Sequence, residues 1–310
     1  MFEILRDDDS RPVRLTAIVP ATNRPATLQE CLNAIAGADD PPEQTIVVDD
    51  PSLTHPAFAR NAGARDAAGE VLVFVDADVT VHPDAFRRIR RAFTDDRTLD
   101  ALFGSYDDAP AARGSVSFFR NLLHHHVHQG APGPASTFWA GLGAVRRTAF
   151  EAAGGFSEHP IEDIELGMRM FESRKRIVLD PGIQGKHLKN WTLWTMLRTD
   201  LVVRGIPWVG LLLEHRGSAS ASTLNLGWRH RLSALASLLL LAGVGLWKPL
   251  IAGAAVAMLI ALNLPFYALL RRKGGLLRAT AGLFLHVLHH LVAVLAVPLG
   301  ALNYVARPPR

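Results

Sequence analysis

The C-terminal part of the chain contains no acidic residue. From Gly217 to Arg310 there is no Asp or Glu, while nine Lys or Arg residues flank long apolar stretches. A helix crosses the core of a bilayer with about 20 consecutive apolar residues. Three stretches approach or reach that length: 232–247, 250–270 and 279–305. We therefore predict about three transmembrane helices within residues 229–310.

The positive charges around these stretches predict on which side of the membrane the rest of the chain lies. Arg229 and Arg231 precede the first stretch, and further Lys and Arg residues between 271 and 278 separate the second from the third. Segments rich in Lys and Arg stay in the cytoplasm. With three spans, both clusters and the N-terminal part face the cytoplasm. This predicts a multi-pass protein of the cytoplasmic (inner) membrane, and residues 1–14 lack the apolar core of a signal peptide.

The charge of the remaining chain argues against a nucleic-acid partner. The whole chain has a formal net charge of +4, but the excess lies in the tail, and residues 1–216 carry about −5. Basic residues that flank apolar stretches indicate a membrane rather than nucleic acid. The single cysteine, Cys31, excludes an internal disulfide and a cysteine-based zinc site. We expect it to be buried in a helix.

Residues 1–190 alternate short β-branched runs with amphipathic stretches. Strands that are apolar on both faces and alternate with helices predict an α/β fold with a parallel sheet covered on both sides. The predicted strands are 13–19, 45–48, 71–75, 101–104 and 177–179, and the predicted helices are 26–36, 57–68, 84–93 and 161–171.

Polar residues follow the first three predicted strands. Asn23 comes after the first strand, Asp49 and Asp50 come after the second, and Asp76 and Asp78 come after the third. In open α/β sheets, ligands bind outside the carboxyl ends of the strands. The topology therefore predicts a binding site formed by these residues.

The pair Asp76 and Asp78 predicts the chemistry of this site. Side chains alternate along a strand, so carboxylates at i and i+2 point the same way, and they repel each other unless a cation or proton lies between them. Mg²⁺ and Mn²⁺ prefer such hard oxygen ligands and also bind substrate phosphates. We predict a metal that neutralises the diphosphate leaving group of a nucleotide-sugar. The alternative is a pair of strand-end aspartates without a ligand.

The same residues also match another enzyme class. Asp76, Asp78 and Thr80 form the Asp-x-Asp-x-Thr element of haloacid-dehalogenase-type phosphatases, in which the first Asp is a nucleophile. That element usually follows the first strand of its domain, whereas two predicted strands precede it here. A phosphatase and a membrane scaffold without catalytic activity remain alternatives.

A second acidic motif runs from Ile161 to Arg169 and includes Glu162 and Asp163. Acidic residues are favourable at the N-terminus of a helix. A carboxylate there that faces the sugar would accept the proton of an acceptor hydroxyl. The alternative is ordinary helix-terminal charge.

These motifs, in this order, resemble the family 2 glycosyltransferases of the GT-A fold. The resemblance implies a Rossmann-like GT-A domain over residues 1–190, an inverting displacement with Asp163 as the catalytic base, and a metal held by Asp76, Asp78 and His187. The matching segments are 17–20, 47–50, 59–63, 76–78, 141–147, 154–156 and 162–163.

The resemblance also implies a nucleotide-sugar site. Asp49 or Asp50 would hold the nucleobase or ribose, with Arg60 nearby, and Lys186 would bind diphosphate or lipid phosphate. Processive members carry Gln-x-x-Arg-Trp after the base, but this chain has different spacing between Gln184 and Trp191, so we expect a non-processive enzyme. The implied site is Pro20, Asn23, Asp49, Asp50, Arg60, Asp76, Gly141, Glu162, Lys186 and Trp191.

Two further segments concern the acceptor side. Trp and Leu residues beside Arg residues between 191 and 215 predict an interfacial amphipathic segment over residues 191–228; the alternative is an amphipathic helix packed on the domain. The histidines between 124 and 128 point in different directions on a helix, so we expect a polar or acceptor-lining helix rather than one metal site. His286 and His290 share a helix face at membrane depth.

The predicted reaction transfers a sugar from a nucleotide-diphosphate-sugar to a membrane-embedded lipid acceptor, either a polyprenyl phosphate or a glycolipid. The apolar tail motivates the lipid acceptor, because a soluble acceptor needs no such anchor. A glycosyltransferase of cell-wall or exopolysaccharide assembly is the alternative.

Overall fold

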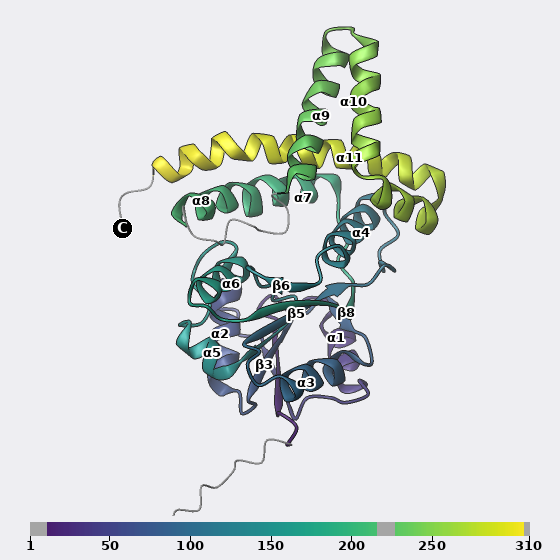
Figure 1. The fold of residues 1–310 in the computed structure, drawn as a ribbon. Helices are drawn as coiled ribbons and strands as arrows, with labels where there is room; N and C mark the ends of the chain where they lie inside the picture. Colours follow the sequence, from purple (N-terminus) through teal and green to yellow (C-terminus); the bar gives the residue numbers. More distant parts are fainter. Residues whose placement is uncertain (1–10, 216–226, 307–310) are drawn as a thin grey trace, which may run out of the picture.

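The computed structural model describes residues 11–215 and 227–306, which form an α/β domain beneath a layer of helices (Figure 1). Residues 1–10 and residues 216–226 of the predicted interfacial segment lie outside the described residues.

Three parallel strands form one side of the sheet. β1 (Leu15–Pro20) lies between β2 (Gln44–Val48) and β3 (Val71–Val75), and it pairs with both in parallel. Every residue of β3 is fully buried, as expected for a strand covered on both faces. The predicted strands at these positions are confirmed.

Beyond β3 the sheet is mixed, whereas the strand pattern predicted a parallel sheet. β7 (Leu142–Arg146) runs antiparallel between β3 and β5 (Ala101–Tyr106), and β8 (Ile177–His187) is parallel to β5. Two short strands, β4 (Val79–Val81) and β6 (Gly133–Ala135), pair antiparallel with β8. β7 was not predicted because Gly and Ala, which are poor strand formers, occupy its second and third positions.

The predicted helices of the α/β domain are also confirmed. Pro56, whose fixed φ suits a first helical position, begins α2, and Nδ1 of His55 accepts a hydrogen bond of 3.2 Å from the Ala57 N–H. Cys31 is buried on α1, as expected. The helices that pack on the sheet are α1 (Leu28–Ala36), α2 (Pro56–Asp66), α3 (Ala85–Asp95), α5 (Arg147–Ala152) and α6 (Glu162–Glu172).

In the described part of the predicted interfacial segment, residues 193–214 form one continuous helical run. It consists of α7 (Leu193–Arg198), the π-helix η1 (Thr199–Gly205) and α8 (Ile206–Glu214). The π-helical turns of η1 are wider than those of an α-helix, a form common at functional sites. α4 (Ser115–Gln129), which carries the four closely spaced histidines, connects the sheet to this layer.

The prediction of one continuous apolar helix over residues 250–270 was wrong. α10 (Pro249–Leu262) ends before Asn263, whose buried side chain donates a hydrogen bond of 2.9 Å to Oγ of Ser233. α10 instead packs against α9 (Trp228–Gly245) as a hairpin, seen at the top of Figure 1.

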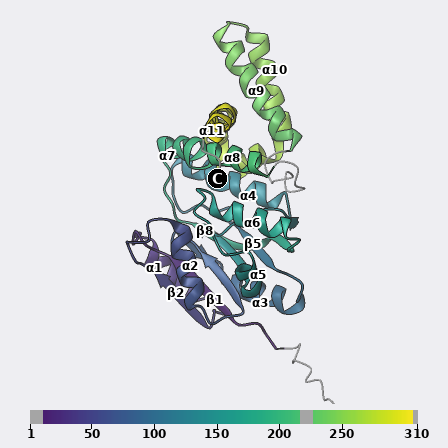
Figure 2. The ribbon, with the colours of Figure 1, turned by 90° about the vertical axis from the view of Figure 1, so that its left-hand side faces the viewer.

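The last helix, α11 (Leu264–Val305), is the one helix in the described part of the chain that is long and apolar enough to cross a membrane. It is broken at Gly275, where φ is +75°. In Figures 1 and 2 it runs crosswise to the α9–α10 hairpin and lies along α8 and η1. A Cβ atom on Gly300 would lie 2.6 Å from Cβ of Val209, so this glycine allows α11 and α8 to pack closely.

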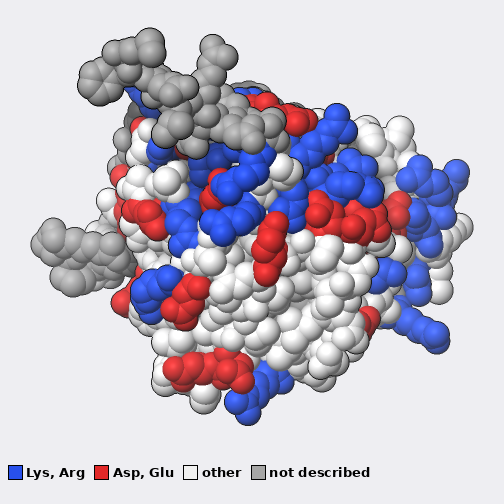
Figure 3. All heavy atoms as spheres, turned by 90° about the horizontal axis from the view of Figure 1, so that it is seen from below, with Lys and Arg blue, Asp and Glu red and all other residues white. Residues whose placement is uncertain are grey.

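The two sides of the molecule differ in polarity. Figure 3 views the α/β domain from below and shows Lys and Arg interspersed with Asp and Glu. Apart from Phe58, every exposed large hydrophobic side chain of the described residues lies between Leu193 and Val305. The helical layer therefore carries the apolar surface, as a membrane-facing side would.

Candidate active site

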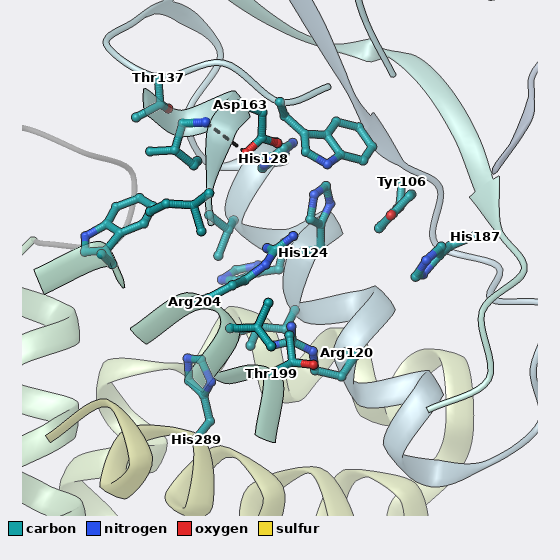
Figure 4. Close-up of a pocket in the computed structure, with 18 of the residues that line it drawn as sticks. Tyr106, Arg120, His124, His128, Thr137, Asp163, His187, Thr199, Arg204 and His289 are labelled. Carbon is teal, nitrogen blue, oxygen red and sulfur yellow. Dashed lines mark hydrogen bonds between the residues drawn. The ribbon is translucent and has the colours of Figure 1, made fainter. Parts of the chain in front are cut away.

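A cavity of about 630 Å³ lies between the sheet and the helical layer (Figure 4). Asp76, Asp78 and Asp163 line one end of it. Residues of α9 and α11, including His289, line the other end, and Arg204 of η1 lies between the two ends. The structure thus brings the two acidic motifs, far apart in the sequence, into one cavity that extends to the apolar helices.

Arg60 connects the two acidic motifs. Its Nη2 atom donates a hydrogen bond of 2.7 Å to Oδ1 of Asp76, and its Nη1 atom donates to Oε1 of Glu162. Burial opposes the charge of Arg60, but the charges of Asp76 and Glu162 outweigh it and raise the Arg60 pKa. Burial raises the pKa of Glu162 despite the nearby Arg60 charge. Arg60 is therefore a permanently charged group that positions the Asp76 carboxylate.

Asp78 lies beside His187 because β4 pairs with β8. The register places Val79 opposite His187, and Oδ2 of Asp78 is 3.6 Å from Nε2 of His187. The ring of Tyr106 stacks on His187 with the ring centroids 4.2 Å apart. Burial raises the pKa of Asp78, but His187 and the charge of Lys189 outweigh it, so the pKa is lowered. Asp78 is therefore ionised at neutral pH.

Asp78 and His187 fit a divalent ion that is bound partly by substrate. In residues 11–215 and 227–306, no group of three or more His, Cys, Asp or Glu side chains is placed to enclose a metal. Mg²⁺ typically uses one or two carboxylates together with substrate phosphates. Asp78 and His187 supply such a partial set, whereas the near oxygen of Asp76 is already bonded to Arg60.

Asp163 lies in the first turn of α6 and lines the cavity. Its Oδ1 atom accepts a hydrogen bond of 2.8 Å from the Ile164 N–H, and its Oδ2 atom accepts one of 3.3 Å from the Ala140 N–H. α6 packs closely against the backbone at Phe138 because residue 167 is glycine. A Cβ atom on Gly167 would lie 2.2 Å from N of Phe138. The backbone thus fixes the carboxylate in the cavity.

Four predicted donor-site residues lie at the carboxyl ends of β1 and β2, outside the lining of this cavity. Pro20 is the last residue of β1 and Asn23 follows it, while Asp49 and Asp50 are exposed after β2. β1 pairs with both β2 and β3, so these residues share an edge of the sheet with Asp76.

Of the remaining predicted residues, Gly141 and Trp191 lie at the site and Lys186 does not. The carbonyl oxygen of Gly141 accepts a hydrogen bond of 3.1 Å from the Asp76 N–H, and Trp191 lines the cavity. The structure does not bring Lys186 to the cavity. Lys186 precedes His187 on β8, and neighbouring side chains of a strand point to opposite faces.

Three histidines of α4, His124, His126 and His128, line the cavity, as expected for a lining helix. The fourth, His125, contacts the Tyr106 carbonyl through Nδ1 at 2.9 Å. Burial lowers the pKa of His124 well below its ordinary value and that of His128 to about 4. Both rings, which are labelled in Figure 4, are therefore neutral at neutral pH.

Several cavity residues were not predicted from the sequence. Tyr106, Arg120 and Trp139 line the cavity but belong to no recognisable motif. For Arg204 the sequence does contain an indication of function. Arg204 and Asp200 are charged residues four positions apart, and the three residues between them are apolar. Charges held in such a stretch often have a functional role.

The sheet and the two acidic motifs that meet at its edge define a glycosyltransferase of the GT-A fold. The family model for glycosyl transferase family group 2 matches residues 71–299, and the chain belongs to this family. The predicted family, fold class and enzyme class are confirmed. The phosphatase and scaffold alternatives are set aside.

Solved structures that are similar to the chain include other glycosyltransferases. Mannosyltransferase PcManGT from Pyrobaculum calidifontis, solved with GDP-Man and Mn²⁺, is 19% identical with a TM-score of 0.54 over 96% of this chain and 89% of that one. GalNAc-T7 with UDP, GalNAc and Mn²⁺ is 13% identical with a TM-score of 0.47 over 76% and 54%. TarS 1–349 from S. aureus is 16% identical with a TM-score of 0.44 over 91% and 90%. No curated protein sequence matches the chain.

Proposed function

We propose that this enzyme transfers a sugar from a nucleotide-diphosphate-sugar to a membrane-embedded lipid acceptor, a polyprenyl phosphate or a glycolipid, in a metal-dependent, inverting and non-processive reaction. The observation that carries the proposal is the single cavity. It contains Asp76, Asp78 and Asp163 at one end and is lined by residues of α9 and α11 at the other. A soluble acceptor needs no path from apolar helices to these carboxylates.

The donor part of the proposal uses the carboxyl edge of the sheet. Asp49 or Asp50 contacts the nucleobase or ribose, and the diphosphate lies near Asp76 and Asp78. Mg²⁺ or Mn²⁺, held by Asp78 and His187, supplies Lewis-acid stabilisation of the diphosphate leaving group. PcManGT, which shares the fold, was solved with GDP-Man and Mn²⁺.

Asp163 is the proposed catalytic base. An acceptor hydroxyl oxygen attacks the anomeric carbon from the face opposite the diphosphate, the hydroxyl proton passes to Asp163, and the bond from the anomeric carbon to the diphosphate breaks. The oxygen of a phosphate acceptor, which is ionised at neutral pH, attacks in the same way without giving up a proton. The Ala140 and Ile164 N–H groups support this role, because they hold the carboxylate in the cavity.

The membrane part of the proposal places α11 along the bilayer surface. α11 packs on α4, η1 and α8 along its length, and Lys273 forms an ion pair of 2.6 Å with Asp108 of the α/β domain. A bilayer crossing by α11 would take those parts of the domain into the membrane. Burying their charges in hydrocarbon is unfavourable.

With α11 on the surface, the α9–α10 hairpin enters the bilayer. We therefore propose two helices within the membrane instead of the three predicted spans. α9 has 18 residues and α10 has 14, which gives lengths of about 27 and 21 Å against a hydrocarbon core of about 30 Å. The tip carries one basic residue, Lys248, beside Trp247, which is 90% exposed, whereas two, Arg229 and Arg231, lie at the base. This charge placement supports a cytoplasmic catalytic domain on the inner membrane.

Calorimetric titration of detergent-purified protein with UDP, GDP and dTDP, with and without Mn²⁺, tests the proposed donor site. We expect Mn²⁺-dependent binding of one nucleotide, lost in Asp78→Ala and retained in Asp95→Ala, a change of an exposed aspartate on α3. Failure of all three nucleotides to bind in the presence of Mn²⁺ would contradict the donor site.

A further inference from the structure

The middle of the cavity is lined by cations from several elements. We call these residues the basic chamber: Arg120 of α4, Lys189, Arg198 of α7, Arg204 of η1 and Arg229 of α9. The chamber lies between the catalytic carboxylates and the apolar helices. The donor site already accounts for Asp76, Asp78 and His187, but it leaves this concentration of positive charge unexplained.

One carboxylate, Asp200, partly neutralises the chamber. It forms an ion pair of 2.8 Å with Arg120, and Nδ1 of His289 lies 2.9 Å from its other oxygen. These contacts fix Arg120 in place. In contrast, Arg204 makes no hydrogen bond or ion pair with another described residue, and Figure 4 shows its side chain extending between His289 and His124.

Two residues that line the cavity near the chamber, Trp191 and His124, each have a ring nitrogen without a hydrogen-bond partner among the described residues. Nε1 of Trp191 and Nδ1 of His124 are buried and make no hydrogen bond to any described residue. The Trp191 ring contacts two cations, with Cζ of Arg120 at 5.1 Å and Nζ of Lys189 at 4.4 Å from its centroid. Guanidinium and ammonium groups, of which the chamber has five, are the donors that bind phosphate oxygens.

We propose that the basic chamber binds the phosphate group of the lipid acceptor. The inference rests on the proposed transfer to a lipid and narrows the acceptor to one with a phosphate-bearing headgroup. Phe266 and Asn263, which line the cavity next to α9, mark the direction in which the apolar chain leaves. The position of the chamber holds the headgroup beside Asp163 while the chain remains among the membrane helices.

Binding of farnesyl phosphate to the full-length protein in detergent tests this inference, with farnesol and inorganic phosphate as comparison ligands. The key variant is Arg204→Gln, because this exposed arginine has no hydrogen-bond or ion-pair partner among the described residues whose loss would unfold the chain. We expect farnesyl phosphate to bind at least tenfold more tightly than either comparison ligand. Arg204→Gln raises its Kd about tenfold or more, since a charged hydrogen bond contributes about 1.5–3 kcal/mol, and Arg204→Lys raises it less.

Arg231→Gln is the matched control, since Arg231 lies on α9 near Arg229 but does not line the cavity. It leaves the Kd of farnesyl phosphate unchanged. Equal binding of farnesol would overturn the inference, as would equal binding of inorganic phosphate, which would indicate a site for free phosphate. An unchanged Kd in Arg204→Gln would also overturn it.

Nucleotide titration of the same variants separates this inference from the proposed function. Arg204→Gln keeps the wild-type nucleotide affinity if the chamber serves the acceptor. A parallel loss of nucleotide affinity would assign Arg204 to the donor diphosphate and overturn the inference. If the donor site is wrong, in contrast, no nucleotide binds to wild-type protein while farnesyl phosphate still does.

Discussion

Arg60 and Asp76 are joined by a hydrogen bond of 2.7 Å between Nη2 and Oδ1, and the Arg60 side chain is only 7% exposed. Arg60→Gln leaves the buried Glu162 without its counter-charge. Removing one partner of a buried ion pair costs about 3–5 kcal/mol. We therefore expect Arg60→Gln to lower the free energy of unfolding of the α/β domain by about 3 kcal/mol or more, as measured by urea denaturation.

Arg65→Gln is the control for this change, because Arg65 is an exposed residue of the same helix. A surface substitution of this kind changes stability by about 0.5 kcal/mol or less. If both variants unfold at the same urea concentration, the Arg60 ion pairs do not hold the two acidic motifs together.

Asp163→Asn removes the proposed base and retains the shape of the side chain. General base catalysis contributes about 10²–10⁴-fold, so we expect kcat to fall by that factor while nucleotide affinity stays unchanged. The measurement is the initial rate of sugar transfer to a glycolipid whose acceptor group is a hydroxyl, together with calorimetric titration. Glu151→Gln, at an exposed position on α5, leaves the rate unchanged. If the Asp163→Asn variant keeps most of the wild-type rate, Asp163 is excluded as the base.

Asp200 predicts a pH-dependent contribution to stability. Burial raises its pKa, but the hydrogen bond from His289 and the charge of Arg120 outweigh this, so the pKa is lowered from its ordinary value of 3.8. A carboxyl group of this kind stabilises the fold above its ordinary pKa, and the contribution is lost as the pH falls through the folded value. Asp200→Asn should therefore destabilise the protein at neutral pH, with a difference from wild type that narrows below pH 3.8.

Denaturation midpoints of wild type and Asp200→Asn across this pH range give the measurement. Asp66→Asn, a change of an exposed aspartate on α2, serves as the control and should follow wild type at every pH. A difference for Asp200→Asn that stays constant with pH would show that Asp200 is not ionised in the folded protein.

The acidic end of the cavity was largely predictable, because strand order decides which residues meet. Asp76 and Asp78 follow a fully buried strand, and topology alone places such residues at the edge of the sheet. The distance from Asp78 to His187 was not predictable from the strand pattern. The sequence indicated a strand only to residue 179, because Pro181 and the glycine after it interrupt the apolar run, yet β8 continues through them to His187.

The sequence predicted that the C-terminal part forms apolar helices, but it did not predict how these helices are arranged. Hydropathy identifies apolar helices, but it carries no information on how they cross. The direction of α11 depends on contacts between distant residues, such as the hydrogen bond from His289 to Asp200 and the close approach of Gly300 to Val209. The place of Arg204 in the cavity was not predictable for the same reason, because it depends on the position of η1.

The proposed membrane placement predicts the depth of individual positions. Cys31 is the only cysteine and is buried, so Cys31→Ala gives a background for single-cysteine spin labels. Leu241 on the hairpin is 58% exposed and Leu295 on α11 is 49% exposed, so both accept a label. In proteoliposomes we expect the label at Leu241→Cys to be accessible to oxygen and protected from a water-soluble nickel chelate, because it lies in hydrocarbon.

We expect the label at Leu295→Cys to lie near the headgroups, where both relaxing agents reach it, because α11 follows the bilayer surface. A label at Glu151→Cys on α5 is the aqueous reference and responds mainly to the nickel chelate. The hairpin and α11 are packed crosswise, so they cannot both cross the membrane. If the hairpin enters the bilayer, α11 lies along its surface, and if α11 crosses the bilayer, the hairpin lies along the surface. A label at Leu295→Cys that is deeper than the one at Leu241→Cys would therefore show that α11 is the membrane span and that the hairpin lies on the surface.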